Sequence, residues 1–84
     1  MTELPDLRLK RLRMRSMRRG TREMDILLSR YAEANLPRLA ADMLELFDAL
    51  LDENDQDLYA WVTGQTRPPA RFGALVRDIA DGSN

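Results

Sequence analysis

The sequence contains neither cysteine nor histidine, and these absences exclude several classes of function. Without cysteine, the chain has no disulfide bond, no thiolate nucleophile and no zinc site built from cysteine and histidine. Without histidine, it lacks the side chain that proteins most often use for proton transfer near neutral pH. Carboxylates could replace it only in a pocket that raised their pKa values. We therefore expect a protein that is not an enzyme and has no metal site.

Long hydrophobic runs are also absent. No stretch of eighteen apolar residues occurs, so the sequence predicts no transmembrane helix. The basic N-terminus lacks the continuous apolar stretch of a secretory signal. Glu3 and Asp6 argue against a mitochondrial presequence, because such segments are poor in acidic residues. We expect a cytoplasmic protein that does not insert into a membrane.

β-Branched residues are scarce, whereas the helix formers Leu, Ala, Arg, Glu and Met recur throughout the chain. This composition predicts an all-α fold. A chain of 84 residues buries only about 60% of the surface that its unfolded form exposes, which leaves little room for a deep substrate pocket. We therefore expect a single helical domain over residues 1–84, folded as a small compact bundle of about five helices.

The net charge of −1 conceals a strong separation of charge along the chain. Residues 1–22 hold eight Lys and Arg against two acids, a net charge of +6. Residues 23–62 hold ten acids against two Arg, a net charge of −8, and residues 63–84 carry +1. Such a separation indicates pairing within the fold, electrostatic steering of a partner, or both.

Hydrophobic periodicity predicts three amphipathic helices. The first covers residues 22–34, where apolar side chains follow the spacing i, i+3, i+4, i+7: Met24, Leu27, Leu28 and Tyr31. Pro37 suits the first turn of the second helix, which continues to about residue 52. The last helix is C-terminal and repeats the same spacing: Phe72, Leu75, Val76 and Ile79.

Two further helices rest on weaker signals. We expect a helix over residues 6–16 from propensity alone, because its apolar residues scatter around the helical wheel. A short helix through Leu58, Trp61 and Val62 follows the acidic run 52–57, and Gly64 ends it. The acidic run does not follow the spacing of an EF-hand loop, so we interpret it as a helix cap rather than a calcium site.

Gly20 lies in the basic segment between the first two predicted helices. The simplest interpretation is a helix C-cap, because glycine adopts the left-handed conformation that ends many helices. The missing Cβ could also let another backbone, a cofactor or a partner approach closely, and the two interpretations are compatible. The neighbouring Arg18, Arg19 and Arg22 could recognise carboxylates or phosphates, or simply form a solvated basic face beside Glu23.

The basic segment also raises nucleic acid as a partner, either directly or in a toxin-neutralising (antitoxin-like) module. Two features count against this alternative. The chain as a whole is acidic, and all five aromatic residues lie beyond residue 30, so no aromatic ring interleaves with the basic side chains. Separately, no glycine-rich phosphate loop is present, so a dedicated nucleotide pocket of the familiar kinds is absent. We expect no nucleic-acid partner.

Two motifs together give the sequence a recognisable pattern. Arg19-Gly20-Thr21-Arg22-Glu23 has the form Arg-Gly-x-x-Glu, and Asp55-Gln56-Asp57-Leu58-Tyr59-Ala60-Trp61 follows downstream. At this separation, the pair resembles the succinate dehydrogenase flavinylation factors. These assembly proteins promote covalent attachment of FAD to the flavoprotein subunit. The resemblance spans roughly residues 8–80.

The resemblance implies a bundle of five helices in which the Arg-Gly-x-x-Glu turn docks on a flavoprotein. The main candidates for partner binding are Arg19, Gly20 and Glu23, and the supporting candidates are Arg18, Arg22 and Asp25. The implied partner is the flavoprotein subunit of succinate dehydrogenase or fumarate reductase. We expect a monomer that binds no cofactor stably.

The resemblance also limits the mechanism. In these dehydrogenases the flavin is attached to a histidine of the partner, and this chain has no histidine of its own. The chain could align the partner's histidine with FAD, which is catalysis by positioning. An arginine near the flavin could also stabilise developing negative charge. We favour positioning, because it requires no shifted pKa in this chain.

Overall fold

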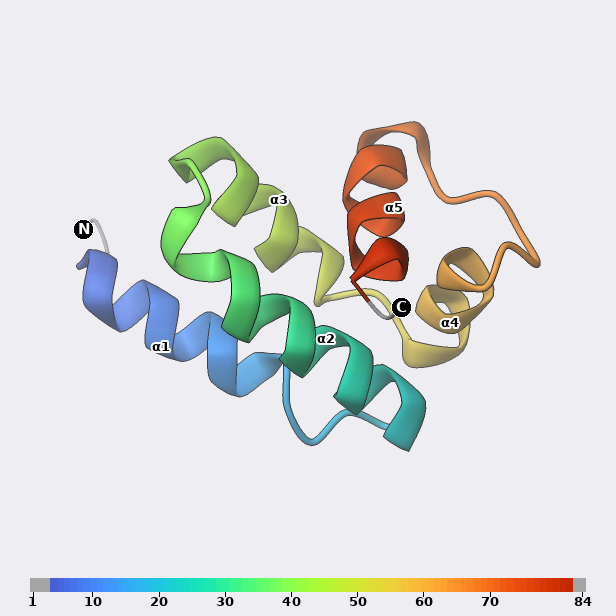
Figure 1. Ribbon diagram of the computed structural model, residues 1–84, viewed down its shortest axis with the longest axis horizontal. Coiled ribbons are helices and arrows are strands. Elements are labelled where there is room, and N and C mark those ends of the chain that lie inside the picture. The colour runs from blue at the N-terminus through green and yellow to red at the C-terminus, as the bar shows by residue number, and fades with distance from the viewer. Residues whose placement is uncertain (1–3, 83–84) are drawn as a thin grey trace.

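The computed structural model describes residues 4–82, and within this range the chain is all-α, as predicted (Figure 1). Two short 3-10 helices accompany five α-helices. The α-helices are α1 (Pro5–Arg15), α2 (Arg22–Asn35), α3 (Ala41–Leu50), α4 (Asp55–Val62) and α5 (Gly73–Asp81). The 3-10 helices are η1 (Leu36–Arg38) and η2 (Ala70–Phe72). None of the helices in the described range is long and apolar enough to cross a membrane.

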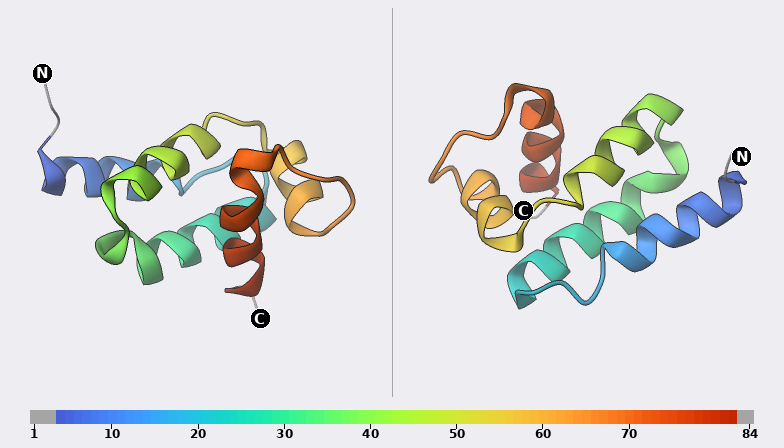
Figure 2. Two further views of the ribbon diagram at one scale, coloured as in Figure 1. Left: turned by 90° about the horizontal axis from the view of Figure 1, so that it is seen from above. Right: turned by 180° about the vertical axis from the view of Figure 1, so that it is seen from behind.

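Helix α2 is the central element. It runs back alongside α1, and α3 then returns along its other side, as Figures 1 and 2 show. Helix α2 also contacts α4 and α5, which pack against each other at the far end of the molecule. This arrangement brings the turn between α1 and α2 close to the start of α4. The two motifs identified in the sequence therefore meet in space.

The core is one cluster of buried side chains drawn from all five helices. Its members are Leu12, Met24, Leu28, Tyr31, Ala32, Leu36, Phe47, Leu50, Leu51, Leu58, Phe72, Leu75, Val76 and Ile79. The predicted stripes of α2 and α5 supply much of it, and each large side chain contributes roughly 1.5–3 kcal/mol through burial. Ile26, which points away from the α2 stripe, remains 45% exposed.

Helix α1 forms with few core contacts. Pro5 occupies its first turn, where a missing N–H costs nothing. Leu12 is its one fully buried apolar side chain, whereas Leu7 and Met14 are exposed. The prediction of a helix without a single apolar stripe is confirmed, with bounds one residue earlier than expected. Ion pairs to α3, described below, hold much of this helix in place.

The prediction for Pro37 is wrong. Pro37 lies in η1, which follows α2 directly, and α3 begins only at Ala41. Because proline has no N–H to continue the α-helical ladder, the last turn of α2 tightens into a 3-10 turn. Leu39 and Ala40 then adopt extended backbone angles, so α3 starts in a new direction.

Gly64 ends α4, as predicted. Its φ of +79° is left-handed, and its N–H donates to the carbonyl of Trp61 over 3.2 Å. The N–H of Gln65 donates to the carbonyl of Ala60 over 2.8 Å. These two bonds form a Schellman motif, which satisfies carbonyls that the helix end leaves open. Pro68 and Pro69 then carry the chain across to η2 and α5.

Two glycine substitutions should change stability in opposite directions. Gly64→Ala should destabilise the fold by about 1 kcal/mol, because an L-residue is strained at this positive φ. Gly73→Ala should stabilise it by about 0.5 kcal/mol, since Gly73 has helical angles and an added Cβ would meet nothing within 4 Å. Urea denaturation of both variants and the wild type measures the difference. Equal free energies of unfolding for the two variants would contradict this account.

Candidate functional site

The site begins at the turn of residues 16–21 between α1 and α2. Ser16 caps α1, and its buried hydroxyl donates to the carbonyl of Leu12 over 2.8 Å. Arg18, not Gly20, has the left-handed backbone of this turn, with a φ of 56°. The interpretation of Gly20 as a helix C-cap is therefore wrong. Helix α1 ends before Gly20 is reached, and within residues 4–82 the positive-φ glycine is Gly64.

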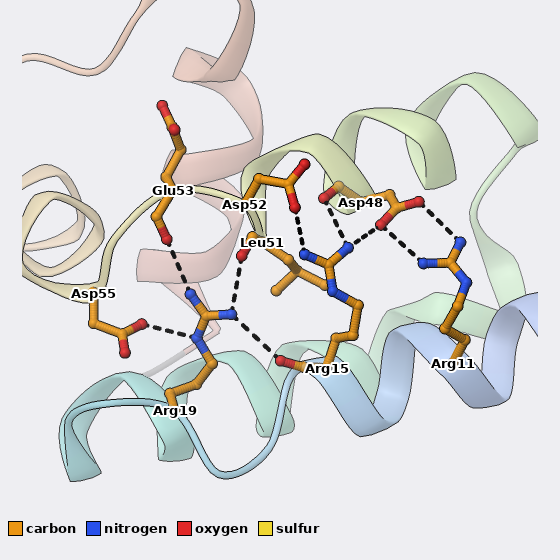
Figure 3. A network of polar contacts seen from close by, with 8 residues as sticks. All are labelled: Arg11, Arg15, Arg19, Asp48, Leu51, Asp52, Glu53 and Asp55. Atoms are coloured by element: carbon orange, nitrogen blue, oxygen red, sulfur yellow. Dashed lines mark hydrogen bonds and ion pairs between the residues drawn. The ribbon is translucent and has the colours of Figure 1, made fainter.

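Arg19 is directed into the protein (Figure 3). Its Nε donates to Oδ1 of Asp55 over 2.8 Å, and both side chains are only 12–13% exposed. The two terminal nitrogens of its guanidinium donate to backbone carbonyls of Arg15, Leu51 and Glu53. The guanidinium thus satisfies carbonyls at the C-terminal end of α3, where a positive charge is favourable.

Gly20 meets the same carboxylate. Its N–H donates to Oδ2 of Asp55, while Oδ1 accepts from Arg19. A Cβ added at Gly20 would lie 2.8 Å from Oδ2, too close for an undisturbed structure. The missing Cβ allows the side chain of Asp55 to approach the backbone. The approaching group thus belongs to this chain, whereas the sequence led us to expect another backbone, a cofactor or a partner. Asp55 is the first residue of α4, so these hydrogen bonds join the turn to the start of that helix.

A ladder of ion pairs continues this connection along α1 (Figure 3). Arg11 donates through both terminal nitrogens to the carboxylate of Asp48, at 3.1 and 2.9 Å. Arg15 pairs with Asp48 as well, and with Asp52 over 2.6 Å. Hydrogen bonds from Arg11 and the charges of both arginines hold the pKa of Asp48 below its usual value, against a smaller opposing effect of burial.

Asp25 and Thr21 stabilise the turn from the α2 side. The Thr21 hydroxyl accepts from the N–H of Met24 as the N-cap of α2. Oδ1 of Asp25 accepts from the N–H of Arg18 over 3.1 Å and from the Ser29 hydroxyl over 3.2 Å. Asp25 thereby stabilises the strained backbone of Arg18.

The remaining predicted residues face outward. The side chains of Arg18, Arg22 and Glu23 are exposed, and no hydrogen bond or ion pair joins them to another side chain of residues 4–82. Glu23 also lines a shallow cleft of about 290 Å³. Its other walls are Thr21, Gln56 and Tyr59. A carboxylate beside an exposed phenol ring provides a suitable place for a cationic side chain of a partner.

The six predicted residues therefore lie together but divide into two groups. Arg19, Gly20 and Asp25 make contacts within the protein, whereas Arg18, Arg22 and Glu23 are available on the surface. Residues 4–82 contain no group of three or more acidic side chains arranged to hold a metal ion. The acidic run provides a helix cap, as predicted, since Asn54 accepts from the N–H of Asp57 over 2.8 Å.

Comparison with known proteins assigns this arrangement to a family. Residues 10–82 match the Sdh5 family, described as the flavinator of succinate dehydrogenase. The chain belongs to this family. The match covers both motifs and all of the contacts that join the turn to α3 and α4. It confirms the resemblance identified from the sequence.

Individual relatives agree with the family match. The "FAD assembly factor SdhE" of Legionella pneumophila (strain Paris) is 40% identical over 62 residues, which cover 74% of this chain and 78% of the relative. The "Succinate dehydrogenase assembly factor 2, mitochondrial" of Mycosarcoma maydis is 39% identical over 71 residues, or 84% of this chain and 30% of the relative. The protein of the same name from Schizosaccharomyces pombe is 36% identical over 70 residues, or 83% and 50%. The chain thus spans half or less of the length of these two mitochondrial relatives.

The residues around the turn and the cleft that were not predicted as site residues are Thr21, Asp55, Gln56 and Tyr59. Asp55 belongs to the downstream motif, yet the sequence offered only helix capping as its role. The available signal was the spacing of the charges. Arg11, Arg15 and Arg19 recur every four residues, and Asp48, Asp52 and Asp55 recur every three or four. Two matched helical spacings of opposite charge indicate two facing helices.

The contact between Gly20 and Asp55 can be tested by a double-mutant cycle. Gly20→Ala should destabilise the fold by about 1 kcal/mol, because the Cβ displaces a hydrogen-bonded carboxylate. In an Asp55→Ala background the same substitution should be close to neutral, since the nearest atoms are removed. Urea denaturation of the four proteins gives the coupling. If the effects of the two substitutions on the free energy of unfolding are additive, the contact with Asp55 is not the reason for a glycine at position 20.

The lowered pKa of Asp48 makes its contribution to stability depend on pH. The stabilisation is present above the unfolded-state pKa of about 3.9 and is lost as pH falls through the lower folded-state value. Because these side chains are about a third exposed, Asp48→Asn should cost only about 0.5–1 kcal/mol at pH 7. This cost should shrink below about pH 4. A cost that grows on acidification would contradict the assigned direction.

Proposed function

We propose that this chain is an assembly factor that docks on the flavoprotein subunit of succinate dehydrogenase and promotes covalent attachment of FAD. The family match over residues 10–82 is the observation that carries the proposal. The names of the bacterial and mitochondrial relatives support it, because they refer to FAD assembly and succinate dehydrogenase assembly. The flavoprotein of a fumarate reductase is an alternative target of the same kind. The proposal includes a monomer acting in the cytoplasm.

The proposed mechanism is positioning. The chain has no histidine and no cysteine to accept the flavin or transfer a proton, so the bond forms between groups of the partner and FAD. The factor contributes by holding the partner in the conformation that aligns those groups, which lowers the entropic part of the barrier. In this proposal the factor holds no FAD of its own.

The internal contacts of Arg19 favour positioning over direct stabilisation of flavin charge. Its guanidinium already donates to Asp55 and to three backbone carbonyls. Turning it toward a ligand would leave those acceptors without a partner, at a cost of about 1–3 kcal/mol for each buried group. We assign Arg19, Gly20 and Asp25 to positioning the turn. Arg18, Arg22 and Glu23 then form the surface that meets the partner.

The nucleic-acid alternative gains no support from the structure. Arg11, Arg15 and Arg19 pair with acidic side chains of α3 and α4. The basic segment therefore does not present its full charge of +6 to a phosphate backbone. Part of the charge separation noted in the sequence is pairing within the fold, and only part is left to steer a partner.

Glu23→Ala should abolish most of the activity without affecting the fold. Glu23 is exposed, so its removal should change the unfolding free energy by less than about 0.5 kcal/mol. Covalent flavin in the co-expressed flavoprotein should fall about tenfold or more, because a partner cation would lose its carboxylate. Flavin fluorescence of the denatured flavoprotein in a gel measures this.

Glu33→Ala is the matched control, since Glu33 is an exposed carboxylate of the same helix, away from the turn. It should leave covalent flavin at the wild-type level. If Glu23→Ala also supports normal flavinylation, the proposed docking surface is wrong. If the wild-type chain itself does not increase covalent flavin, the proposed function is wrong.

A further inference from the structure

A second depression lies at the end of the molecule formed by α4, the loop to α5 and α5 itself. We call it the Trp61 groove and define it by Trp61, Val62, Arg67, Val76, Arg77 and Ala80. Its volume is about 500 Å³, and it is open to solvent along one side. Helix α5 supplies one wall through residues spaced i, i+3, i+4, i+7, beginning at Gly73. It shares no lining residue with the cleft at Glu23.

The floor of the groove is apolar. The Trp61 ring stacks on the buried Phe72, with ring centroids 6.1 Å apart, and Trp61 itself is only partly buried. Val62 and Val76 extend this apolar surface. Gly73 also lines the groove, and a Cβ added there would meet no atom within 4 Å, so a side chain at this position would extend into open space. Such a floor suits an apolar side chain of a binding partner.

The walls of the groove carry positive charge without any acidic residue. Arg67 comes from the loop and Arg77 from α5, and no hydrogen bond or ion pair joins the side chain of either to another residue in the described part of the chain. The third arginine of this region, Arg71, lies outside the groove and covers the Phe72 ring at 4.4 Å. The lining of the groove holds two arginines and no acidic residue. It therefore offers a local site for carboxylates, although residues 23–62 carry a net charge of −8.

Helix α4 connects the groove to the docking surface at the turn. Gln56 and Tyr59 line the cleft at Glu23, whereas Trp61 and Val62 line the groove. The helix has only eight residues, so the two depressions lie on either side of an element about 12 Å long. A partner of the size of an enzyme subunit that contacts the cleft can therefore reach the groove.

We propose that the Trp61 groove binds an acidic segment of the flavoprotein in which an apolar side chain is adjacent to carboxylates. The apolar side chain lies on Trp61, and the carboxylates pair with Arg67 and Arg77. An open groove covers only one side of its occupant, which suits an extended peptide better than a small ligand that needs enclosure. This inference rests on the proposed function, because the flavoprotein supplies the segment.

The test compares the affinity of the purified flavoprotein subunit for wild-type chain and for two kinds of variant. Arg67→Gln/Arg77→Gln removes the charges, and Gly73→Leu fills the groove but keeps them. Each variant should raise the dissociation constant of the complex about tenfold or more. Arg71→Gln is the matched control, because it removes one arginine outside the groove, and it should bind within about twofold of wild type. Circular dichroism checks that every variant is folded.

A second arm uses Trp61 itself as the probe, because it is the single tryptophan of the chain. The acetylated and amidated peptide Glu-Leu-Asp-Leu-Glu should change Trp61 emission in the wild type. The affinity of the double variant for this peptide, read from the same emission change, should be at least about tenfold lower. The analogue with Gln and Asn in place of the acids should have no effect. If ADP changes the emission and the peptide does not, the occupant is a small anion and the proposal is wrong.

The outcomes separate the two proposals. If both groove variants bind the flavoprotein as tightly as wild type, the groove is not a docking site, and the proposed function remains intact. If the wild-type chain does not bind the flavoprotein at all, both proposals fail. If the double variant does not fold, the comparison rests on Gly73→Leu, whose helical backbone angles accept a side chain.

Discussion

One carboxylate, that of Asp55, holds the candidate site together. Its two oxygens accept from the Arg19 guanidinium and the Gly20 N–H, so a single side chain joins the turn after α1 to the start of α4. Charge-assisted hydrogen bonds of this kind are stronger and more directional than neutral ones. They are also only 12–13% exposed, which reduces screening by solvent. The orientation of Arg18, Arg22 and Glu23 follows from this anchor.

This anchor explains why a basic segment of +6 does not behave as one surface. The arginines at every fourth position, 11, 15 and 19, pair with acidic side chains of residues 48–55, whereas Arg13 and Arg18 lie between them and remain exposed. The same electrostatic contacts compensate for the small apolar contribution of α1, where Leu12 alone is fully buried. A small chain can thereby keep an exposed, charged surface in a fixed conformation without a large core. Fixed geometry is what a factor acting by positioning requires.

Much of the fold could be predicted from the sequence, and the failures have physical causes. Helices α2 and α5 followed from apolar spacing, and the end of α4 followed from Gly64, because these signals are local. Pro37 was assigned to the wrong helix, because a proline at the start of one helix and a proline at the end of another look alike in sequence. The role of Gly20 was also misjudged, since its reason is Asp55, which lies 35 residues away. The family resemblance indicated the candidate site, but only the contacts showed which of its residues are held within the fold and which remain exposed.

The central claim is that Asp55 fixes the turn, and amide hydrogen exchange at Gly20 tests it most directly. In the wild-type chain the Gly20 amide should exchange far more slowly than an unprotected amide, although the residue is exposed, because it donates to Asp55. In Asp55→Ala this protection should disappear, while the amide of the buried Leu28 in α2 keeps its own. A Gly20 amide that exchanges at the unprotected rate in the wild type would contradict the account.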